Sequence, residues 1–194
     1  MQMQIFRKAV LGLMALGLTL SALAILSCGG GDDNNTFTRQ ANLQGVNERL
    51  TPVLTTSGSG TAVLTINDDH TQISYTLTYT GLTNVLQAHI HVVNSPELAG
   101  PIILFLCTNI GVGTNVGIGG AQLPAPQACP QGSTVTVTGT LTSADLIPRD
   151  ATPTSPAIAT FADAIAQILN GNTYTNVHTQ ANPGGEIRGT DLPQ

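Results

Sequence analysis

The sequence predicts an all-β domain, an antiparallel β-sandwich or barrel with one short crossover helix. Three observations predict this class. Several short segments alternate apolar and polar residues with period two, turn residues separate these segments, and a single strong segment has the helical spacing of apolar residues. Because strands and helices do not alternate along the chain, a parallel sheet is not expected.

The first 27 residues have the pattern of an export signal. Arg7 and Lys8 precede the apolar run of residues 9–26, and the tetrapeptide ILSC that ends at Cys28 resembles a bacterial lipobox, in which this cysteine receives lipid. Two alternatives stay open. The apolar run is just long enough to anchor an uncleaved chain in a bilayer, and it also suits an ordinary cleaved signal. Residues 28–36 are rich in Gly, Asp and Asn and are predicted to be a flexible tether to a domain at 37–194.

A lipid on Cys28 predicts an exported protein attached to the bacterial cell envelope through the membrane. Gly29 stands where some inner-membrane lipoproteins have an aspartate, so the outer membrane or the cell surface is the expected destination. Once Arg7 and Lys8 are removed, the chain keeps four arginines, no lysine and eleven acidic residues. With so little positive charge to neutralise phosphates, nucleic acid is not an expected partner.

Two cysteines remain when Cys28 is assigned to lipid. An oxidising compartment favours a disulfide between Cys107 and Cys129, with two free thiols as the alternative. The bridge would close a loop of about 20 residues and stabilise the fold by roughly 3 kcal/mol. Residues 108–132 are rich in Gly and Pro, lack periodicity and are predicted to form a long surface loop whose ligand, if any, the composition does not identify.

The first strand signals form a hairpin. TAVLTIN (61–67) and QISYTLTYT (72–80) alternate apolar and polar residues, and NDDH (67–70) supplies the turn, so His70 is expected to be solvated. STVTVTGTLT (133–142) predicts a further strand with one buried face. The continuous apolar run PIILFLC (101–107) predicts a strand that is buried on both faces.

One helix is predicted in SPAIATFADAIAQILNG, from Ser155 to a stop at Asn170 and Gly171. Its apolar residues recur at helical spacing and are expected to pack in the core. A shorter turn is expected over residues 143–148, with Ser143 as its cap.

Histidines stand out in two of the remaining segments. In QAHIH, His89 and His91 share one strand face, and the aliphatic residues at 88, 90 and 92 share the other, which is expected to face the core. In TYTNVHT, Asn176 and His178 share a face by the same rule. If the two strands pair, His178 meets the other two histidines, and Glu186 and Arg188 of GEIRG can join the cluster as an ion pair.

The segments QAHIH (87–91), FTRQANLQGVNE (37–48) and NGNTYTNVHTQANPGGEIRGT (170–190) together resemble the CHRD domain, the module named after chordin. The resemblance extends over about residues 37–190 and departs from the family pattern mainly in loops. It implies a β-domain of the kind found in many exported bacterial proteins. It assigns no reaction, and carrying over a protein partner would be an analogy from fold alone.

Three hypotheses describe the histidines. The leading one is a structural cluster, in which His89, His91 and His178 form hydrogen bonds with Asn176, Glu186 and Arg188 and no cofactor is needed. The alternative is a zinc or copper site built by the three histidines. Catalysis is the third, and it is not favoured because no nucleophile motif appears. The sequence therefore predicts a non-catalytic binding or envelope-associated structural module, whose protein partner it does not name.

Overall fold

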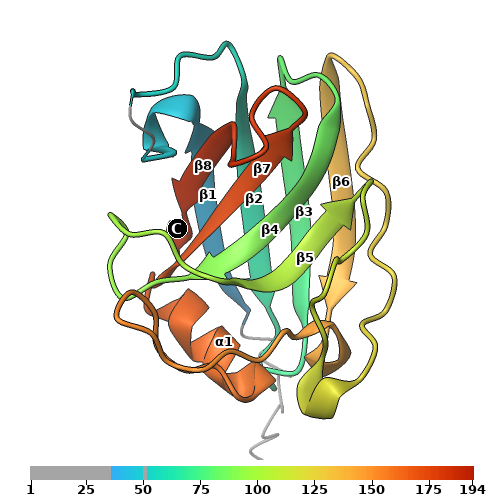
Figure 1. The fold of residues 1–194 in the computed structure, drawn as a ribbon. Helices are drawn as coiled ribbons and strands as arrows, with labels where there is room; N and C mark the ends of the chain where they lie inside the picture. Colours follow the sequence, from blue (N-terminus) through green and yellow to red (C-terminus); the bar gives the residue numbers. More distant parts are fainter. Residues whose placement is uncertain (1–35, 50–51) are drawn as a thin grey trace, which may run out of the picture. The chain divides into compact units, whose positions relative to one another are not determined.

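Antiparallel strands form one sheet that folds over on itself into a nearly closed barrel (Figure 1), which confirms the predicted fold class. The computed structural model describes residues 36–49 and 52–194. The strands follow the order β5-β4-β7-β8-β1-β2-β3-β6, and β9 pairs with β1. Their bounds are β1 Phe37–Gln44, β2 Ser59–Ile66, β3 Ile73–Thr80, β4 Val85–Val92, β5 Ile102–Thr108, β6 Thr134–Leu141, β7 Thr173–Thr179, β8 Ile187–Thr190 and β9 Leu192–Pro193.

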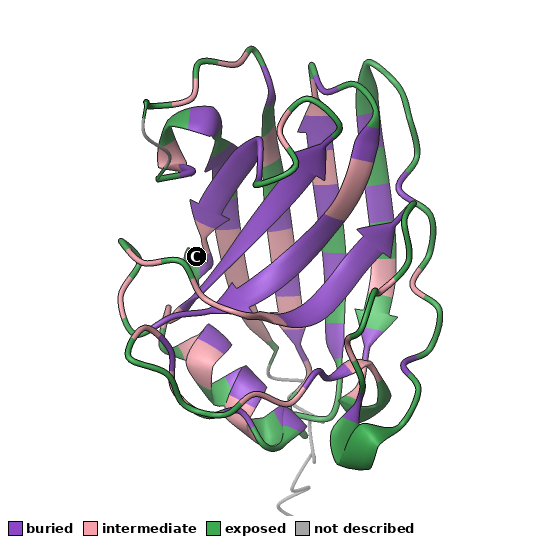
Figure 2. Cartoon of the chain, viewed as in Figure 1, coloured by how far each residue is buried: buried purple, intermediate pink, exposed green. Residues whose placement is uncertain are grey.

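Figure 1 shows β8, β7, β4 and β5 as a layer in front of β1, β2, β3 and β6. The apolar core lies between the layers and includes Ala88, Ile90 and Val92 of β4, as predicted. The back strands alternate buried and exposed residues, whereas β4, β5 and β7 are buried along most of their length (Figure 2). The outer face of the front layer is therefore covered as well, and this is the face that carries the histidines.

The predicted hairpin is β2 and β3, which pair along their whole length. The Asn67 side chain holds the turn by accepting hydrogen bonds of 2.9 Å from the backbone N–H groups of Thr71 and Gln72. His70 lies exposed in this turn, as expected. The predicted strand at 101–107 is β5, and it is buried on both faces.

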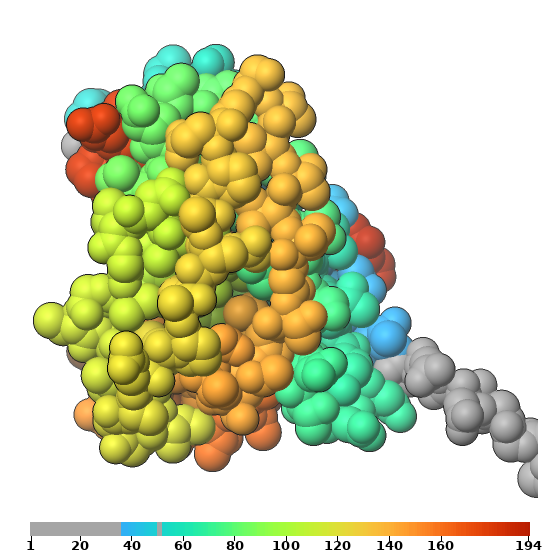
Figure 3. Space-filling view, turned by 90° about the vertical axis from the view of Figure 1, so that its right-hand side faces the viewer, coloured from blue at the N-terminus to red at the C-terminus, as the bar shows by residue number. Residues whose placement is uncertain are grey.

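The predicted disulfide is present, with Cα atoms of Cys107 and Cys129 5.0 Å apart. The long loop that it closes contains the 3₁₀ turn η2 (Ile118–Gly120) and runs between β5 and β6 (Figure 3). Gln127 ties this loop to β3 and β6, because its side-chain amide donates to the Tyr75 hydroxyl and to the carbonyl oxygen of Thr138. Tyr75 in turn donates to the carbonyl oxygen of Leu106.

The helix differs from its prediction at its first residue. α1 spans Phe161–Leu169 and begins after a capping box formed by Thr160 and Asp163, so the expected start at Ser155 was wrong. Ser155 instead pairs with Thr152 in a short bridge. The end agrees with the prediction, since Asn170 caps the helix and Gly171 follows at φ 72°. The turn η3 (Ser143–Asp145) is capped by Thr142 and not by Ser143.

The predicted export signal (1–27), the lipid-accepting Cys28 and all but the last residue of the tether (28–36) lie outside the described residues. These expectations remain predictions. Within the described ranges, no helix combines the length and the apolar composition that crossing a bilayer requires.

Candidate metal centre

Strand register brings the three histidines together on the outer face of the front layer. β4 pairs with β7, so that Gln87 lies opposite His178, His89 opposite Asn176 and His91 opposite Tyr174. Side chains of directly opposed residues project to the same side of a sheet. The ring centroids of His89 and His178 are 4.8 Å apart, and those of His89 and His91 are 5.4 Å apart.

All three imidazoles are buried, with exposed fractions of 0 % for His89, 8 % for His91 and 7 % for His178. Aromatic rings form part of the surrounding wall. Phe105 of β5 meets His89 edge to face at 4.7 Å, and Tyr174 of β7 stacks on His91 at 4.6 Å. Water is thus largely excluded from the cluster.

Two of the histidines are oriented by backbone carbonyls. His91 Nδ1 lies 2.8 Å from the carbonyl oxygen of Gly100, and His178 Nδ1 lies 3.0 Å from that of Pro183. A carbonyl oxygen only accepts, so each Nδ1 carries the proton and each Nε2 presents a lone pair. Those two Nε2 atoms, and both ring nitrogens of His89, are buried without a hydrogen-bond partner.

Burial lowers the pKa of all three imidazoles. The pKa of His91 falls to about 3, where burial dominates and the hydrogen bond to Gly100 opposes the shift. The pKa of His89 lies well below 6.5 because of burial and then the neighbouring His91 and His178. Burial also lowers the pKa of His178. The cluster is therefore neutral at neutral pH, which is the state that binds metal ions.

This arrangement fits a metal ion. One nitrogen from each histidine lies within 4.8 Å of the others. Zinc–nitrogen bonds of about 2.0–2.1 Å place tetrahedral ligand atoms roughly 3.3 Å apart. The nitrogens would therefore have to move closer together when an ion binds, by rotation of the imidazole rings. Metal-bound histidines generally donate their second ring N–H to a carbonyl or carboxylate, as His91 and His178 do here.

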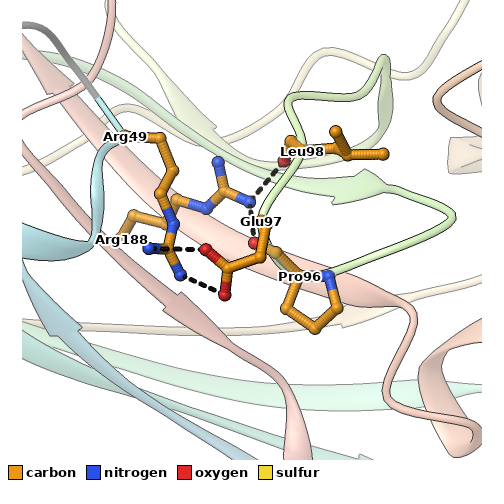
Figure 4. A network of polar contacts seen from close by, with 5 residues as sticks. All are labelled: Arg49, Pro96, Glu97, Leu98 and Arg188. Carbon is orange, nitrogen blue, oxygen red and sulfur yellow. Dashed lines mark hydrogen bonds and ion pairs between the residues drawn. The ribbon is translucent and has the colours of Figure 1, made fainter.

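The predicted ion pair between Glu186 and Arg188 is not formed. Glu186 accepts hydrogen bonds of 2.5 Å from the hydroxyls of Thr56 and Thr179. Arg188 donates to the carbonyl oxygens of Pro96 and Leu98 at 2.9 and 2.6 Å (Figure 4). Residue 186 precedes β8, so strand alternation does not fix its direction. Its carboxylate is held by the segment before β2 and the end of β7, and the segment between β4 and β5 holds the guanidinium of Arg188.

Arg188 lies beside the histidine cluster without bonding to it. Its guanidinium carbon is 3.4 Å from the centroid of the Tyr174 ring, which also stacks on His91. Asn176, the third member of the predicted structural cluster, lies between Arg188 and His89 in register, yet its Oδ1 atom has no hydrogen-bond partner. The structure thus brings the histidines, Asn176 and Arg188 together but does not join them in a satisfied network, and Glu186 has other partners.

Glu48 is a buried member of this region that sequence reasoning missed. It follows the 3₁₀ turn η1 (Gly45–Asn47) and is 5 % exposed. Burial raises its pKa to about 7, against the lowering effects of the Arg188 charge and the Asn176 amide. Its one sequence signal was its place as the last residue of FTRQANLQGVNE, a segment that carried the family resemblance.

Comparison with known proteins agrees with the resemblance. The family model described as the CHRD domain matches residues 39–190, which is most of the chain. A search of curated proteins finds no match.

Proposed function

The chain belongs to the CHRD domain family, whose members are generally non-catalytic binding or structural modules, and from this premise we propose that it binds a zinc or copper ion through His89, His91 and His178. The observation that carries the proposal is the group of buried imidazole nitrogens that have no hydrogen-bond partner. Backbone carbonyls orient two of the three rings, those of His91 and His178. Metal binding thereby replaces the structural cluster as the leading hypothesis.

The unpartnered nitrogens weigh against a purely structural role. Each buried polar atom without a partner costs about 1 to 3 kcal/mol, and a core that needed no ligand would be more stable with apolar residues at these positions. A bound ion removes this cost at one nitrogen of each histidine, because each supplies one lone pair to the metal, and one of the two His89 nitrogens keeps its cost.

Three imidazole donors are compatible with a zinc or a copper ion. Imidazole suits both, and copper(II) is bound more tightly than zinc by most nitrogen sites. Sulfur ligands are not expected. All three methionines lie in the first 14 residues, and the two cysteines of the described part form the disulfide.

We further propose that the domain works outside the cytoplasm, attached to the cell envelope by a lipid on Cys28. The disulfide supports export, since such bonds persist mainly in oxidising compartments. The metal centre would then bind ions that are present outside the cytoplasm, and a tether over residues 28–36 would keep the domain near the membrane.

Metal content is the experiment that tests the metal site. The chain is purified without chelator and its metals are counted by mass spectrometry, with His89→Ala and the exposed His70→Ala as a matched pair. We expect close to one zinc or copper ion per wild-type and His70→Ala chain and much less in His89→Ala. A well-folded wild-type protein that holds no metal and takes up none would contradict the proposal and return the histidines to a structural role.

A further inference from the structure

The metal centre needs a negative charge that its ligands do not supply. Three neutral imidazoles leave the full charge of a bound ion uncompensated, and Arg188 adds another positive charge nearby. Burying a cation is costly unless an opposite charge lies close to it. The inference that follows rests on the metal centre proposed above and concerns the group that balances its charge.

Three carboxylates are buried in the described part of the chain: Glu48, Glu186 and Asp191. Glu186 has both oxygens bonded to threonine hydroxyls. Asp191 likewise accepts from Thr173 and Thr175, whose register partners on β4 face the core, away from the histidines. Glu48 makes no such bonds, and its Oε1 atom is buried without a partner. It is therefore the buried carboxylate with an oxygen left to interact with a bound ion, and the charge of Arg188 also acts on it.

Two contacts fix the position of Glu48 beside β8 and Gly185. Asn47 donates from its side-chain amide to the carbonyl oxygen of Arg188 at 3.0 Å, which ties η1 to β8. On the other side the carboxylate packs against Gly185, where a Cβ would lie only 2.6 Å from the carboxyl carbon. This glycine is two residues after Pro183, whose carbonyl orients His178.

Asn176 separates Glu48 from the ligands. It lies opposite His89 on β4, and its amide is close enough to lower the pKa of Glu48. The set of mutually close ligand atoms contains the three histidines and not Glu48, so the carboxylate stands outside the coordination sphere. It can act on the ion through space and through the Asn176 amide.

We propose that Glu48 is the charge-balancing residue of the metal centre and that it makes the site selective for divalent over monovalent ions. The attraction between two charges is proportional to each of them, so one carboxylate stabilises a divalent ion twice as much in free energy as a monovalent ion at the same position. Removing the charge then lowers the two affinities by different factors. The factor for the divalent ion is the square of the factor for the monovalent ion.

The test compares Zn²⁺ and Cu⁺ affinities of the full chain at pH 8 in wild type, Glu48→Gln and Glu97→Gln. Glu97 is the matched control, a carboxylate that is 67 % exposed and paired with Arg49. We expect Glu48→Gln to weaken Zn²⁺ binding by at least about 10-fold and Cu⁺ binding by about 3-fold, and Glu97→Gln to change neither. The charge-preserving Glu48→Asp should keep most of the Zn²⁺ preference.

The outcomes separate the two proposals. A wild-type chain that binds neither ion contradicts the metal centre itself. A wild-type chain that binds both, with equal losses or no loss in Glu48→Gln, keeps the metal centre and overturns the role of Glu48. If Glu48→Gln does not fold, Asn176→Asp places a new negative charge beside the ligands and should raise the ratio of Zn²⁺ to Cu⁺ affinity. An unchanged ratio in that variant overturns the inference.

Discussion

His91 Nδ1 donates a hydrogen bond of 2.8 Å to the carbonyl oxygen of Gly100, and this contact determines which nitrogen of the ring faces the cluster. Gly100 belongs to the segment between β4 and β5, whose carbonyls at Pro96 and Leu98 also accept from Arg188. One connecting segment thus orients a candidate ligand and holds a cation beside it. The Nε2 lone pair of His91 is left without a protein partner.

A metal ion should therefore stabilise the folded protein. A ligand present at 1,000 times its dissociation constant adds about 4 kcal/mol to the free energy of unfolding. For a domain of this size that corresponds to a rise in Tm of roughly 8–16 °C. We expect Zn²⁺ to produce a rise of this order in the wild type, chelator to reverse it, and His178→Ala to abolish it, as measured by thermal unfolding.

The matched control for this measurement is His70→Ala. His70 is exposed in the turn between β2 and β3, two strands that do not pair with β4 or β7, so this variant should keep the full zinc response. An equal zinc response in His178→Ala would place the binding elsewhere in the protein. The comparison uses the shift caused by zinc, so any loss of packing in the metal-free variant does not affect it.

Patterns among neighbouring residues predicted the strands and turns, whereas several contacts between distant segments of the chain were not predictable from the sequence. Alternation and turn residues predicted the hairpin of β2 and β3, and the same alternation placed His89, His91 and His178 on one face. Glu186 was paired with the wrong residue because its position just before β8 leaves its direction to the surrounding loops. Glu48 was missed because the folding of η1 onto β8, and not any periodicity, brings it to the histidines. The helix start was wrong because the capping box at Thr160 prevails over the signal at Ser155.

Asp191 should make stability depend on pH. It is fully buried, and burial raises its pKa from 3.8 to about 6, although Thr173 and Thr175 donate to it. A raised pKa in the folded state means that its contribution is fully present below pH 3.8 and is lost as the pH rises through 6. The loss amounts to about 3 kcal/mol, at 1.36 kcal/mol per pKa unit.

The variant that isolates this effect is Asp191→Asn, because threonine hydroxyls can rotate to bond an amide. Relative to the metal-free wild type, the free energy of unfolding of the variant should rise by about 2.5 kcal/mol between pH 4 and pH 8 in urea unfolding. The lowered pKa values of the histidines act in the opposite direction, with stability lost as the pH falls below 6.5. That contribution is common to both proteins and cancels. A difference that is equal at both pH values would show that Asp191 does not titrate in this range.

The disulfide should contribute roughly 3 kcal/mol, since it closes a loop of 22 residues that the unfolded chain would otherwise leave free. We expect the double variant Cys107→Ala/Cys129→Ala to unfold at lower urea concentration than the oxidised wild type. Reduction should shift the mobility of the wild type in a denaturing gel and leave Cys107→Ala unchanged. A wild-type chain with two reactive thiols after purification from the envelope would show that the bond does not form there.

Lipidation should depend on Cys28. Expressed in a bacterial host with radiolabelled palmitate, the wild-type chain should incorporate label and fractionate with membranes, and Cys28→Ala should do neither. Cys28→Ala also removes the residue that defines the cleavage site, so its signal should remain uncleaved there. Normal processing of this variant would favour an ordinary cleaved signal instead of the lipobox.

Gly185 should be far less tolerant of substitution than its neighbour Gly184. Gly185 has φ of 123°, a backbone conformation that residues with a Cβ atom rarely adopt. A Cβ there would also lie 2.6 Å from the Glu48 carboxyl carbon. At Gly184 an added Cβ meets nothing within 4 Å. We expect Gly185→Ala to lower the free energy of unfolding by about 1 to 3 kcal/mol, and Gly184→Ala to lower it much less.

A double variant tests the position of Glu48. If the carboxylate packs against Gly185, Gly185→Ala/Glu48→Ala should recover the part of the loss that comes from the collision, measured as a non-additive free energy in urea unfolding. Full additivity would mean that the strain of the backbone alone, and not the carboxylate, requires glycine at this position.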